Sequence, residues 1–260
     1  MEQFEAEALY AVMSLLLGAP MGSFAALLAD RLPRGRPVVL TRSRCESCGG
    51  ILRWWELVPL VSFIMLRGRC AQCGGRIPAR LWQAELAGLA LAALALWAGL
   101  GLLGAMVFWC LLALILSDLR FYRLPDVLTG ALVVLACGLA LWPPGGSAWD
   151  WAGLGQAVLG GTVGVAVFWA LGAVFRLLRG RVGMGAGDIR LMAGLGALIV
   201  PAAGWDGLAL MTLIAGLSGI ALGLMRAARR GRGPTRQIRL PFGACLAGAA
   251  IVVRVHAGGV

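Results

Sequence analysis

The chain has 260 residues, of which 60% are hydrophobic and only 13% are charged, and its mean hydropathy is +0.86. A soluble domain has about 25% charged residues, so this composition predicts a membrane protein and argues against a soluble enzyme. All the basic residues are Arg, and the net charge is +11. In a membrane protein such Arg residues typically act as topology signals on cytoplasmic loops. No basic run accompanies a recognisable nucleic-acid-binding module, which argues against a nucleic-acid partner.

Apolar runs along the chain predict an all-α polytopic membrane protein with about eight transmembrane helices. The first run is long enough to span a bilayer and precedes Arg-rich sequence, so we expect a retained helix and no cleaved signal peptide. Several runs are short and rich in Gly and Ala, which predicts close contacts between helices. The predicted spans are 9–29, 82–99, 102–117, 127–142, 152–175, 189–203, 207–225 and 240–255.

The distribution of Arg gives these spans an orientation. Ten Arg lie between Arg31 and Arg80, after the first span. Alternation of the spans places three later Arg clusters on the same side, at 120–123, 176–190 and 226–239. Only Arg254 falls on the other side. The positive-inside rule therefore predicts that the Arg-rich loops face the cytoplasm and that both termini lie outside. The outer side would carry an interfacial belt of Trp142, Trp149, Trp151 and Trp205.

The first loop contains two CxxC pairs, each followed by Gly-Gly. Four thiolates satisfy the tetrahedral preference of Zn²⁺, and a closed set of four Cys indicates a structural and not a catalytic metal. Disulfide bonds are the alternative, which the reducing cytoplasmic side disfavours. The predicted zinc ligands are Cys45, Cys48, Cys70 and Cys73.

The segment 51–66 between the two CxxC pairs is too apolar for a free loop. One interpretation is that it lies on the membrane surface, with Trp54 and Trp55 among the lipid headgroups. The other interpretation is that it packs between the two Cys turns.

Two aspartates, Asp118 and Asp188, lie at predicted membrane boundaries next to hydrophobic sequence. A carboxylate near hydrocarbon costs roughly 2.5–3.5 kcal/mol on insertion scales, so it is seldom kept without a partner or a function. The predicted topology puts both at the same depth on the cytoplasmic side. Two carboxylates that share one proton are the chemistry of an aspartic protease. The spacing alone also allows Asp188 to be an ordinary helix N-cap after the glycines at 183–187.

The chain's motifs, taken together, resemble those of the bacterial prepilin peptidases, also called type IV leader peptidases, a family of GxGD intramembrane aspartic proteases. No single tripeptide is specific, but the order and spacing of the motifs are. In chain order they are Gly22-Ser23-Phe24, Arg31-Leu-Pro-Arg34, the paired CxxC motifs, Ser117-Asp118, Leu124-Pro-Asp126, Gly185-Ala-Gly187-Asp188 and Pro241-Phe-Gly243.

The resemblance implies an enzyme of the bacterial cytoplasmic (inner) membrane with its active site on the cytoplasmic side. Such an enzyme cuts the basic leader from prepilins or pseudopilins of type IV pili and type II secretion. It implies Asp118 and Asp188 as the catalytic pair, with Asp126 accompanying them. Many members also methylate the new N-terminus with S-adenosylmethionine. The remaining motif residues would support the site (Gly185, Gly187, Pro241 and Gly243) or be associated with methyl transfer (Gly22, Ser23, Phe24 and Glu85).

The resemblance implies three regions: a first transmembrane helix (1–29), a cytoplasmic zinc-binding loop with four cysteines (30–81) and a seven-helix protease domain (82–260). Two positions depart from the family pattern: Ala26 stands where an Asn is frequent, and Arg120 where a second acid is frequent. The first departure lies in the region associated with methyl transfer, so a peptidase without methyltransferase activity is one alternative. A non-enzymatic membrane assembly or transport protein with a zinc docking loop is the other.

Overall fold

A computed structural model describes residues 2–39, 42–146, 148–180, 183–229 and 240–258, with side chains from residue 9 onward. The described chain contains helices and short turns but no β-strands apart from two isolated bridges in the Cys loop, which confirms the predicted all-α class. Its long helices are α1 (Glu2–Arg31), α3 (Ala79–Trp97), α4 (Gly101–Phe121), α5 (Asp126–Leu141), α6 (Trp151–Arg179), α7 (Ala186–Arg229) and α8 (Phe242–Gly258).

The length and apolar composition of the helices indicate a multi-pass membrane protein. Five of them are long and apolar enough to cross a bilayer, and the apolar helices α5 and α8 are shorter. Each of the eight predicted spans overlaps a helix, and the sixth and seventh both fall within α7. The predicted number of eight membrane crossings remains a prediction. Of the predicted Arg clusters, residues 181–182 and 230–239 lie outside the described part of the chain.

Helix α7 has 44 residues but does not run in one direction. A straight helix of that length would measure about 66 Å, roughly twice the hydrocarbon thickness of a bilayer. At Gly204 the backbone adopts φ 64° and ψ −166°, which is not helical and which glycine tolerates. Both ends of α7 then lie near the end of α4: a Cβ on Gly187 would be 3.3 Å from Leu124 Cβ, and Arg226 donates to the Tyr122 hydroxyl at 3.2 Å.

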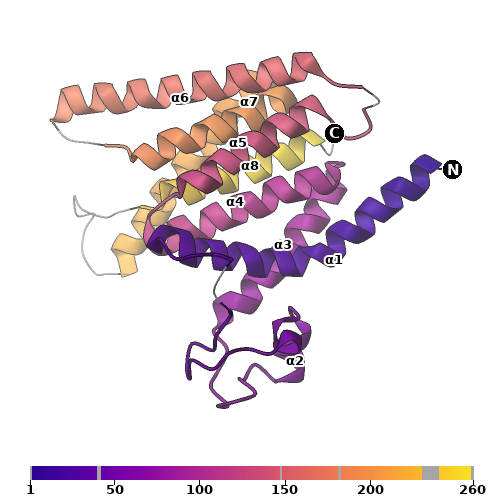
Figure 1. Cartoon of the computed structure of the whole chain (residues 1–260). Coiled ribbons are helices and arrows are strands. Elements are labelled where there is room, and N and C mark those ends of the chain that lie inside the picture. The colour runs from indigo at the N-terminus through magenta and orange to yellow at the C-terminus, as the bar shows by residue number, and fades with distance from the viewer. Residues whose placement is uncertain (1, 40–41, 147, 181–182, 230–239, 259–260) are drawn as a thin grey trace.

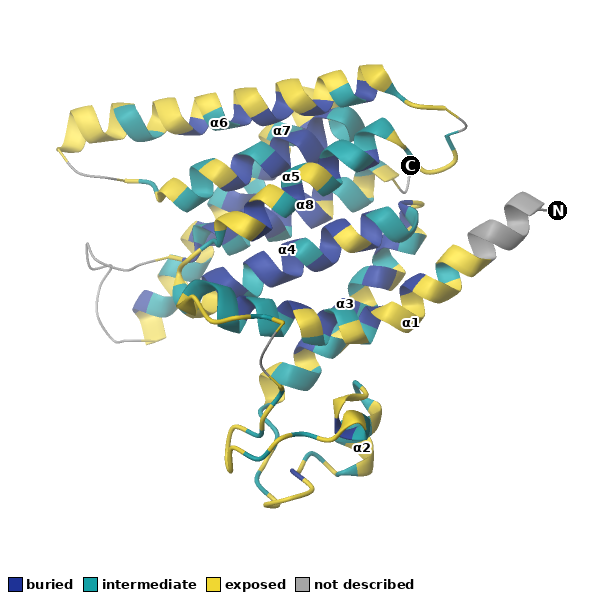
Figure 2. Ribbon diagram, in the orientation of Figure 1, coloured by how far each residue is buried: buried dark blue, intermediate teal, exposed yellow. Residues whose placement is uncertain are grey.

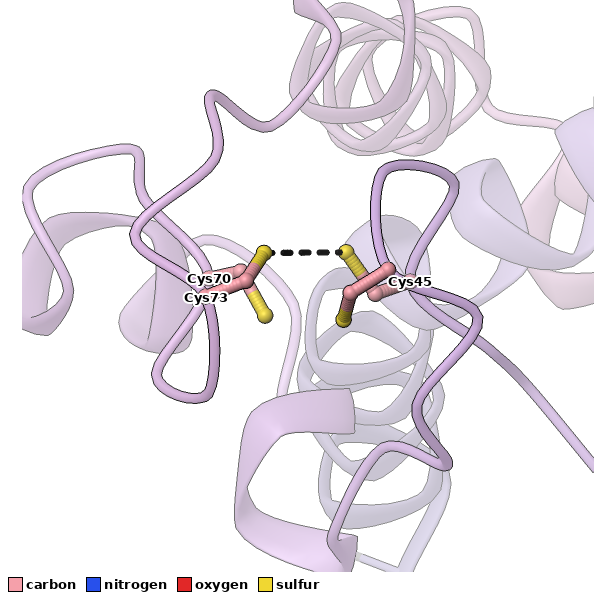
Figure 3. Close-up of side chains that lie close together, drawn as sticks. Cys45, Cys70 and Cys73 are labelled. Carbon is pink, nitrogen blue, oxygen red and sulfur yellow. Dashed lines mark hydrogen bonds between the residues drawn. The ribbon is translucent and has the colours of Figure 1, made fainter.

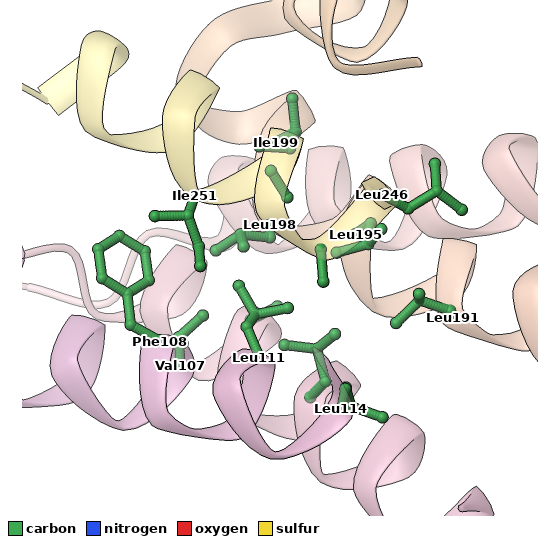
Figure 4. Packing of buried hydrophobic residues seen from close by; sticks show 14 of the residues in the cluster. Val107, Phe108, Leu111, Leu114, Leu191, Leu195, Leu198, Ile199, Leu246 and Ile251 are labelled. Carbon is green, nitrogen blue, oxygen red and sulfur yellow. The ribbon is translucent and has the colours of Figure 1, made fainter. Parts of the chain in front are cut away.

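The helices are arranged around α4 (Figure 1). Helices α1 and α3 pack against one side of α4, whereas α5 and α8 pack against the other and carry α7 beyond them. Helix α6 lies on the outer flank of α7. Buried leucine, isoleucine and aromatic side chains of α4, α7 and α8 meet in the centre (Figure 4). This core holds α4, α7 and α8 together, and they are the three helices that carry the candidate site.

Glycine permits the closest helix contacts, as the Gly-rich runs predict. A Cβ on Gly160 or Gly196 would collide with the backbone of the other helix at the contact between α6 and α7. At the contact between α1 and α3, Gly22 and Gly88 have the same role, because a Cβ on Gly88 would be 2.5 Å from Gly22 Cα. Such contacts let backbones approach within van der Waals distance in a membrane.

The Cys loop between α1 and α3 extends away from the helix bundle and is mostly exposed (Figures 1 and 2). It contains the short helices η1 (Leu32–Arg34), η2 (Trp54–Leu57) and α2 (Val61–Met65). Trp54, Ile64 and Met65 are each more than 70% exposed, so these side chains do not pack between the two Cys turns. Contact of this segment with a membrane surface remains a prediction.

Candidate active site and metal centre

The four Cys of the first loop come together in the structure. The Sγ atoms of Cys45, Cys48, Cys70 and Cys73 all lie within 4.8 Å of one another, and Cys45 Sγ is 4.0 Å from Cys73 Sγ. Figure 3 shows the labelled thiols facing one another across the gap between two turns. Ligands about 2.3 Å from a tetrahedral Zn²⁺ would have sulfurs about 3.8 Å apart, so the cluster could hold this metal after small side-chain adjustments.

Two equivalent turns build this cluster. In the first turn Gly49 N–H donates to Cys45 O at 2.9 Å, and in the second Gly74 N–H donates to Cys70 O at the same distance. Gly49 and Gly74 adopt φ values of +72° and +67°, a conformation that favours glycine. The chain can therefore place four sulfurs at one point because each CxxC motif is followed by a residue that tolerates a left-handed backbone.

The thiols of the cluster differ electrostatically. Hydrogen bonds from the backbone of Cys48 and Ser47 lower the pKa of the Cys45 thiol to about 6. The backbone of Gly75 also favours the thiolate of Cys73, but the surrounding Cys sulfurs outweigh it and raise the pKa of Cys73 to about 11. Accumulating thiolates therefore oppose one another, and a divalent cation between them would balance their charge.

The two predicted acids meet although seventy residues separate them in the sequence. A Cβ placed on Gly243 would lie 3.2 Å from Asp118 Oδ2 and 3.2 Å from Asp188 Oδ1, so these two oxygens are at most twice that distance apart. Asp118 is 5% exposed near the end of α4, and Asp188 is half-buried in the first turn of α7. The two carboxylates therefore face each other with Gly243 beside the gap between them.

The start of α8 completes this arrangement. Ala244 N–H donates to Asp118 Oδ2 at 2.8 Å, a contact that spans 126 residues of sequence. Unpaired N–H groups in the first turn of a helix favour a negative charge, and the first turns of α7 and α8 both lie at the carboxylate pair. Sequence reasoning missed this donor; the Pro241-Phe-Gly243 motif just before it was the available signal.

Leu124 packs over the pair from the turn between α4 and α5. A Cβ on Gly187 would lie 3.3 Å from Leu124 Cβ, and one on Gly243 would lie 2.8 Å from Leu124 Cδ1. The turn itself is fixed because the buried Ser117 hydroxyl donates to Arg123 O at 2.6 Å. Gly187 and Gly243 thus provide the space in which an apolar side chain can cover two carboxylates.

Asp188 is not the N-cap of its helix. It is the third residue of α7, and its N–H donates to Gly185 O at 3.1 Å. A Cβ on Gly185 would lie 3.2 Å from Asp188 Oδ2, so a larger residue there would crowd the carboxylate. Gly185 and Ala186, which precede Asp188 in the chain, are both exposed.

Asp126 lies apart from the pair. Its side chain is 70% exposed in the first turn of α5, and it forms an ion pair with Arg190 of α7. This agrees with the prediction that Asp126 is a carboxylate at a helix start, where the helix dipole favours it, and not an acid–base group. The ion pair between Asp126 and Arg190 also links α5 to α7 next to Asp188.

Arg120, at the position where a second acid is frequent in the family, turns away from the aspartate pair. Its guanidinium lies 2.9 Å from Asp30 near the end of α1, and Arg34 lies 3.0 Å from the same carboxylate. Both guanidinium groups also lie over the ring of Phe121, at 4.8 Å for Arg34 and 5.3 Å for Arg120. Arg120 therefore connects α4 to α1, and the site has no third carboxylate at this position.

The residues associated with methyl transfer form a helix contact. Ser23 Oγ donates to Glu85 Oε1 at 3.1 Å, and Leu60 N–H donates to Glu85 Oε2 at 2.8 Å. Gly22 packs directly on the backbone of α3, whereas Phe24 is 43% exposed. Glu85 thus ties α1, α3 and the Cys loop together, and Gly22 lies in direct contact with the backbone of α3 at Ala84.

Comparisons with known proteins match most of the chain to one family. Residues 16–99 match the bacterial peptidase A24 N-terminal domain, and residues 105–224 match the type IV leader peptidase family. No solved structure matches the chain.

Three relatives are each named prepilin leader peptidase/N-methyltransferase. The protein of Burkholderia pseudomallei strain 1026b is 41% identical over 84% of this chain and 68% of its own length. The protein of Aeromonas hydrophila is 37% identical over 81% and 70%, and that of Pseudomonas aeruginosa is 33% identical over 92% and 87%. The chain therefore belongs to the type IV leader peptidase family.

Proposed function

We propose that this protein is an intramembrane aspartic endopeptidase that removes the basic leader of prepilins or pseudopilins, with Asp118 and Asp188 as its catalytic pair. The observation that carries the proposal is that both carboxylates lie close to Gly243, on helices held by one core. Membership of the leader peptidase family supports the substrate class.

The chemistry needs one ionised and one protonated carboxyl group. Close like charges favour sharing a single proton, and the first turns of α7 and α8 stabilise the remaining charge. The ionised carboxylate removes a proton from a water molecule, whose oxygen attacks the scissile carbonyl. The protonated carboxyl donates to the carbonyl oxygen. The carboxyl group that took up the proton from water then donates it to the amine nitrogen, and the C–N bond breaks.

The location of the pair fits a substrate with an extended cleavage site. Asp118 lies one turn before the end of α4, and Asp188 lies in the first turn of α7, so the pair is at an end of the bundle and not at its middle. A prepilin has an apolar helix that inserts in the bilayer after its basic leader. If the Arg-rich loops face the cytoplasm of the bacterial inner membrane, the cleavage point would arrive at the depth of the two aspartates.

Cleavage of a model prepilin by the purified protein tests this proposal. We expect Asp118→Asn and Asp188→Asn each to abolish cleavage while the protein stays folded by circular dichroism. Cleavage that survives in a folded variant would contradict the proposal. It would place the catalytic groups elsewhere in the chain, whereas absence of cleavage by the purified wild type would favour a non-enzymatic assembly or transport role.

The four-cysteine cluster would hold a structural zinc ion. Cys45, Cys48, Cys70 and Cys73 supply all four ligands, so no position is open for a substrate. Metal analysis of wild type should give one zinc per chain, and a Cys45→Ser, Cys48→Ser double variant should give none. Cys110→Ser is the matched control, since that thiol is far from the cluster in sequence and lies in α4.

N-methyl transfer is a second candidate activity, which the names of the relatives favour. Ala26 in place of Asn, and the closed packing at Gly22, do not favour it. Incubation with prepilin and labelled S-adenosylmethionine decides between the two: label on the mature N-terminus shows both activities, and cleavage without label shows a peptidase alone.

A further inference from the structure

A polar cavity lies at the end of the bundle opposite the aspartate pair. It has a volume of about 290 Å³, near the roughly 300 Å³ lower bound of small-molecule sites. It is bordered by the end of α5, the start of α6, the first half of α7 and the end of α8. Since Asp118 and Asp188 lie near the start of α8 and the start of α7, this cavity is separate from the site of cleavage.

Arg254 is the unusual residue of this cavity. It is the one Arg that the positive-inside rule does not explain, and its Nε atom is buried with no hydrogen-bond partner among the described residues. A partly buried cation is seldom kept in a membrane helix without a partner or a function. Arg254 lines the cavity and is only partly buried, so an anionic group in the cavity would pair with its guanidinium group.

Asp150 lines the same cavity with the opposite charge. Its Oδ1 accepts the N–H of Gly153 at 2.8 Å as the N-cap of α6. In the described part of the chain no ion pair joins Asp150 to Arg254, so the two charges face the cavity without neutralising each other directly. The cavity therefore suits a ligand that carries both a negative and a positive group.

Aromatic side chains place the cavity at the depth of lipid headgroups. Trp142 and Trp149 belong to the turn that leads into Asp150, and their rings stack edge to face with centroids 5.1 Å apart. Trp151, which follows Asp150, is 69% exposed. Tryptophan is enriched where a bilayer meets water, so the lipid headgroups are the groups nearest to this cavity.

We infer that this cavity binds the zwitterionic headgroup of a phospholipid with a primary amine, of the phosphatidylethanolamine type. The phosphodiester would accept hydrogen bonds from the Arg254 guanidinium, whose planar fork matches phosphate oxygens. The ammonium group would donate to the Asp150 carboxylate, and the Gln156 side chain also borders the cavity. This inference goes beyond the peptidase function and does not depend on it.

Native mass spectrometry and thermal unfolding of the full-length protein in detergent test the inference. We expect phosphatidylethanolamine to leave one retained lipid per chain and to raise Tm. Phosphatidylglycerol, which lacks the ammonium group, should bind at least about 10-fold more weakly. Inorganic phosphate should leave Tm unchanged. If inorganic phosphate raised Tm as much as phosphatidylethanolamine does, the site would be one for a free anion and the inference would be wrong.

Substitutions at two positions, Arg254 and Asp150, separate the effects of the two charges. Arg254→Gln should lose the retained lipid. Arg254→Lys keeps the positive charge, so it should keep part of the affinity for the lipid, and a folded Arg254→Lys protein would show that the position tolerates substitution. Asp150→Asn keeps an N-cap residue and should bind phosphatidylethanolamine and phosphatidylglycerol equally. Asp206→Asn and Arg176→Gln remove a charge outside the cavity and should behave as wild type. Unchanged lipid retention in folded Arg254→Gln would overturn the inference.

Discussion

The Cys loop and the helix bundle build their sites in opposite ways. In the loop, each half of the metal cluster is a turn of a few residues, with hydrogen bonds between Cys45 and Gly49 or between Cys70 and Gly74. In the bundle, the aspartate pair depends on contacts between residues as far apart as Asp118 and Ala244. The first site is therefore specified by a local sequence pattern, whereas the second forms only after three helices have packed.

The two sites also differ in what holds their residues in place. The loop is mostly exposed and has little apolar core, so a metal would have to hold it together. The aspartate pair lies against buried residues of α4, α7 and α8, so packing holds it without a ligand. The difference predicts that damage to one site leaves the other intact.

Removal of the proposed zinc should have the largest effect. Zinc binding in finger peptides contributes on the order of 10–16 kcal/mol, so chelation or the Cys45→Ser, Cys48→Ser change should unfold the loop. Limited proteolysis should then cut between residues 42 and 78, while the helices of the bundle stay protected. Loss of the whole bundle under the same treatment would show that the two regions are not independent.

A methyl group between the carboxylates should break the second site. In Gly243→Ala the new Cβ would meet Leu124 Cδ1 at 2.8 Å and both aspartates at 3.2 Å. Misplacement of reacting groups by about 1 Å can cost about 100-fold in rate, so we expect a loss of cleavage of that order. Gly248→Ala is the matched control in the same helix, because no atom lies within 4 Å of its added Cβ. Equal activity of the two variants would contradict the geometry.

Tight packing of α1 on α3 should matter for stability and not for chemistry. In Gly22→Ala the Cβ would collide with the backbone at Ala84 and Glu85, and overpacking costs typically about 1–3 kcal/mol. A fall in Tm with unchanged kcat per folded molecule is the expected result. Gly130→Ala, whose Cβ meets nothing within 4 Å, should hold or raise Tm because alanine favours helix.

Glu85 connects the two regions, and its removal should loosen the loop. Glu85→Ala deletes the acceptor for Leu60 N–H and Ser23 Oγ, and a lost hydrogen bond of this kind costs roughly 1–3 kcal/mol. Hydrogen exchange at Leu60 should become faster, with zinc content unchanged. If exchange at Leu60 kept its wild-type rate, the tether would not be holding the loop.

The smallest effect is expected at Asp126, the acid of the Leu-Pro-Asp motif, which lies apart from the aspartate pair. Asp126→Asn breaks an exposed ion pair with Arg190, and exposed pairs contribute about 0–1 kcal/mol. We expect cleavage within about twofold of wild type, measured beside Asp188→Asn. A loss as large as that of Asp188→Asn would place Asp126 in the chemistry.

The helices and the Cys cluster were predictable because their signals are local. Apolar runs of sufficient length mark the spans, and the spacing of Cys45, Cys48, Cys70 and Cys73 marks the cluster. Helix ends were less accurate, as in α6, which extends to Arg179 instead of residue 175. Pairing of Asp118 with Asp188 was expected from their equal predicted depth and from the family resemblance, since the local sequence around either residue does not fix the contact.

Contacts between distant segments were not predictable. Nothing local to Ala244 indicates that its N–H meets Asp118, and nothing local to Arg120 indicates a partner at Asp30. Glu85 is a clear example, since its role as a tether depends on the position of Leu60 after the loop has folded.

The amino-acid sequence by itself determined that this is a helical membrane protein with a four-cysteine loop, because hydrophobicity and ligand spacing act over a few residues. Only the tertiary structure decided which acids face each other, which acid stays on the surface, and which Arg is left facing a cavity. The physical reason is that carboxylates and guanidinium groups find their partners across helix contacts, and those contacts are fixed by the packing of side chains from many separate segments.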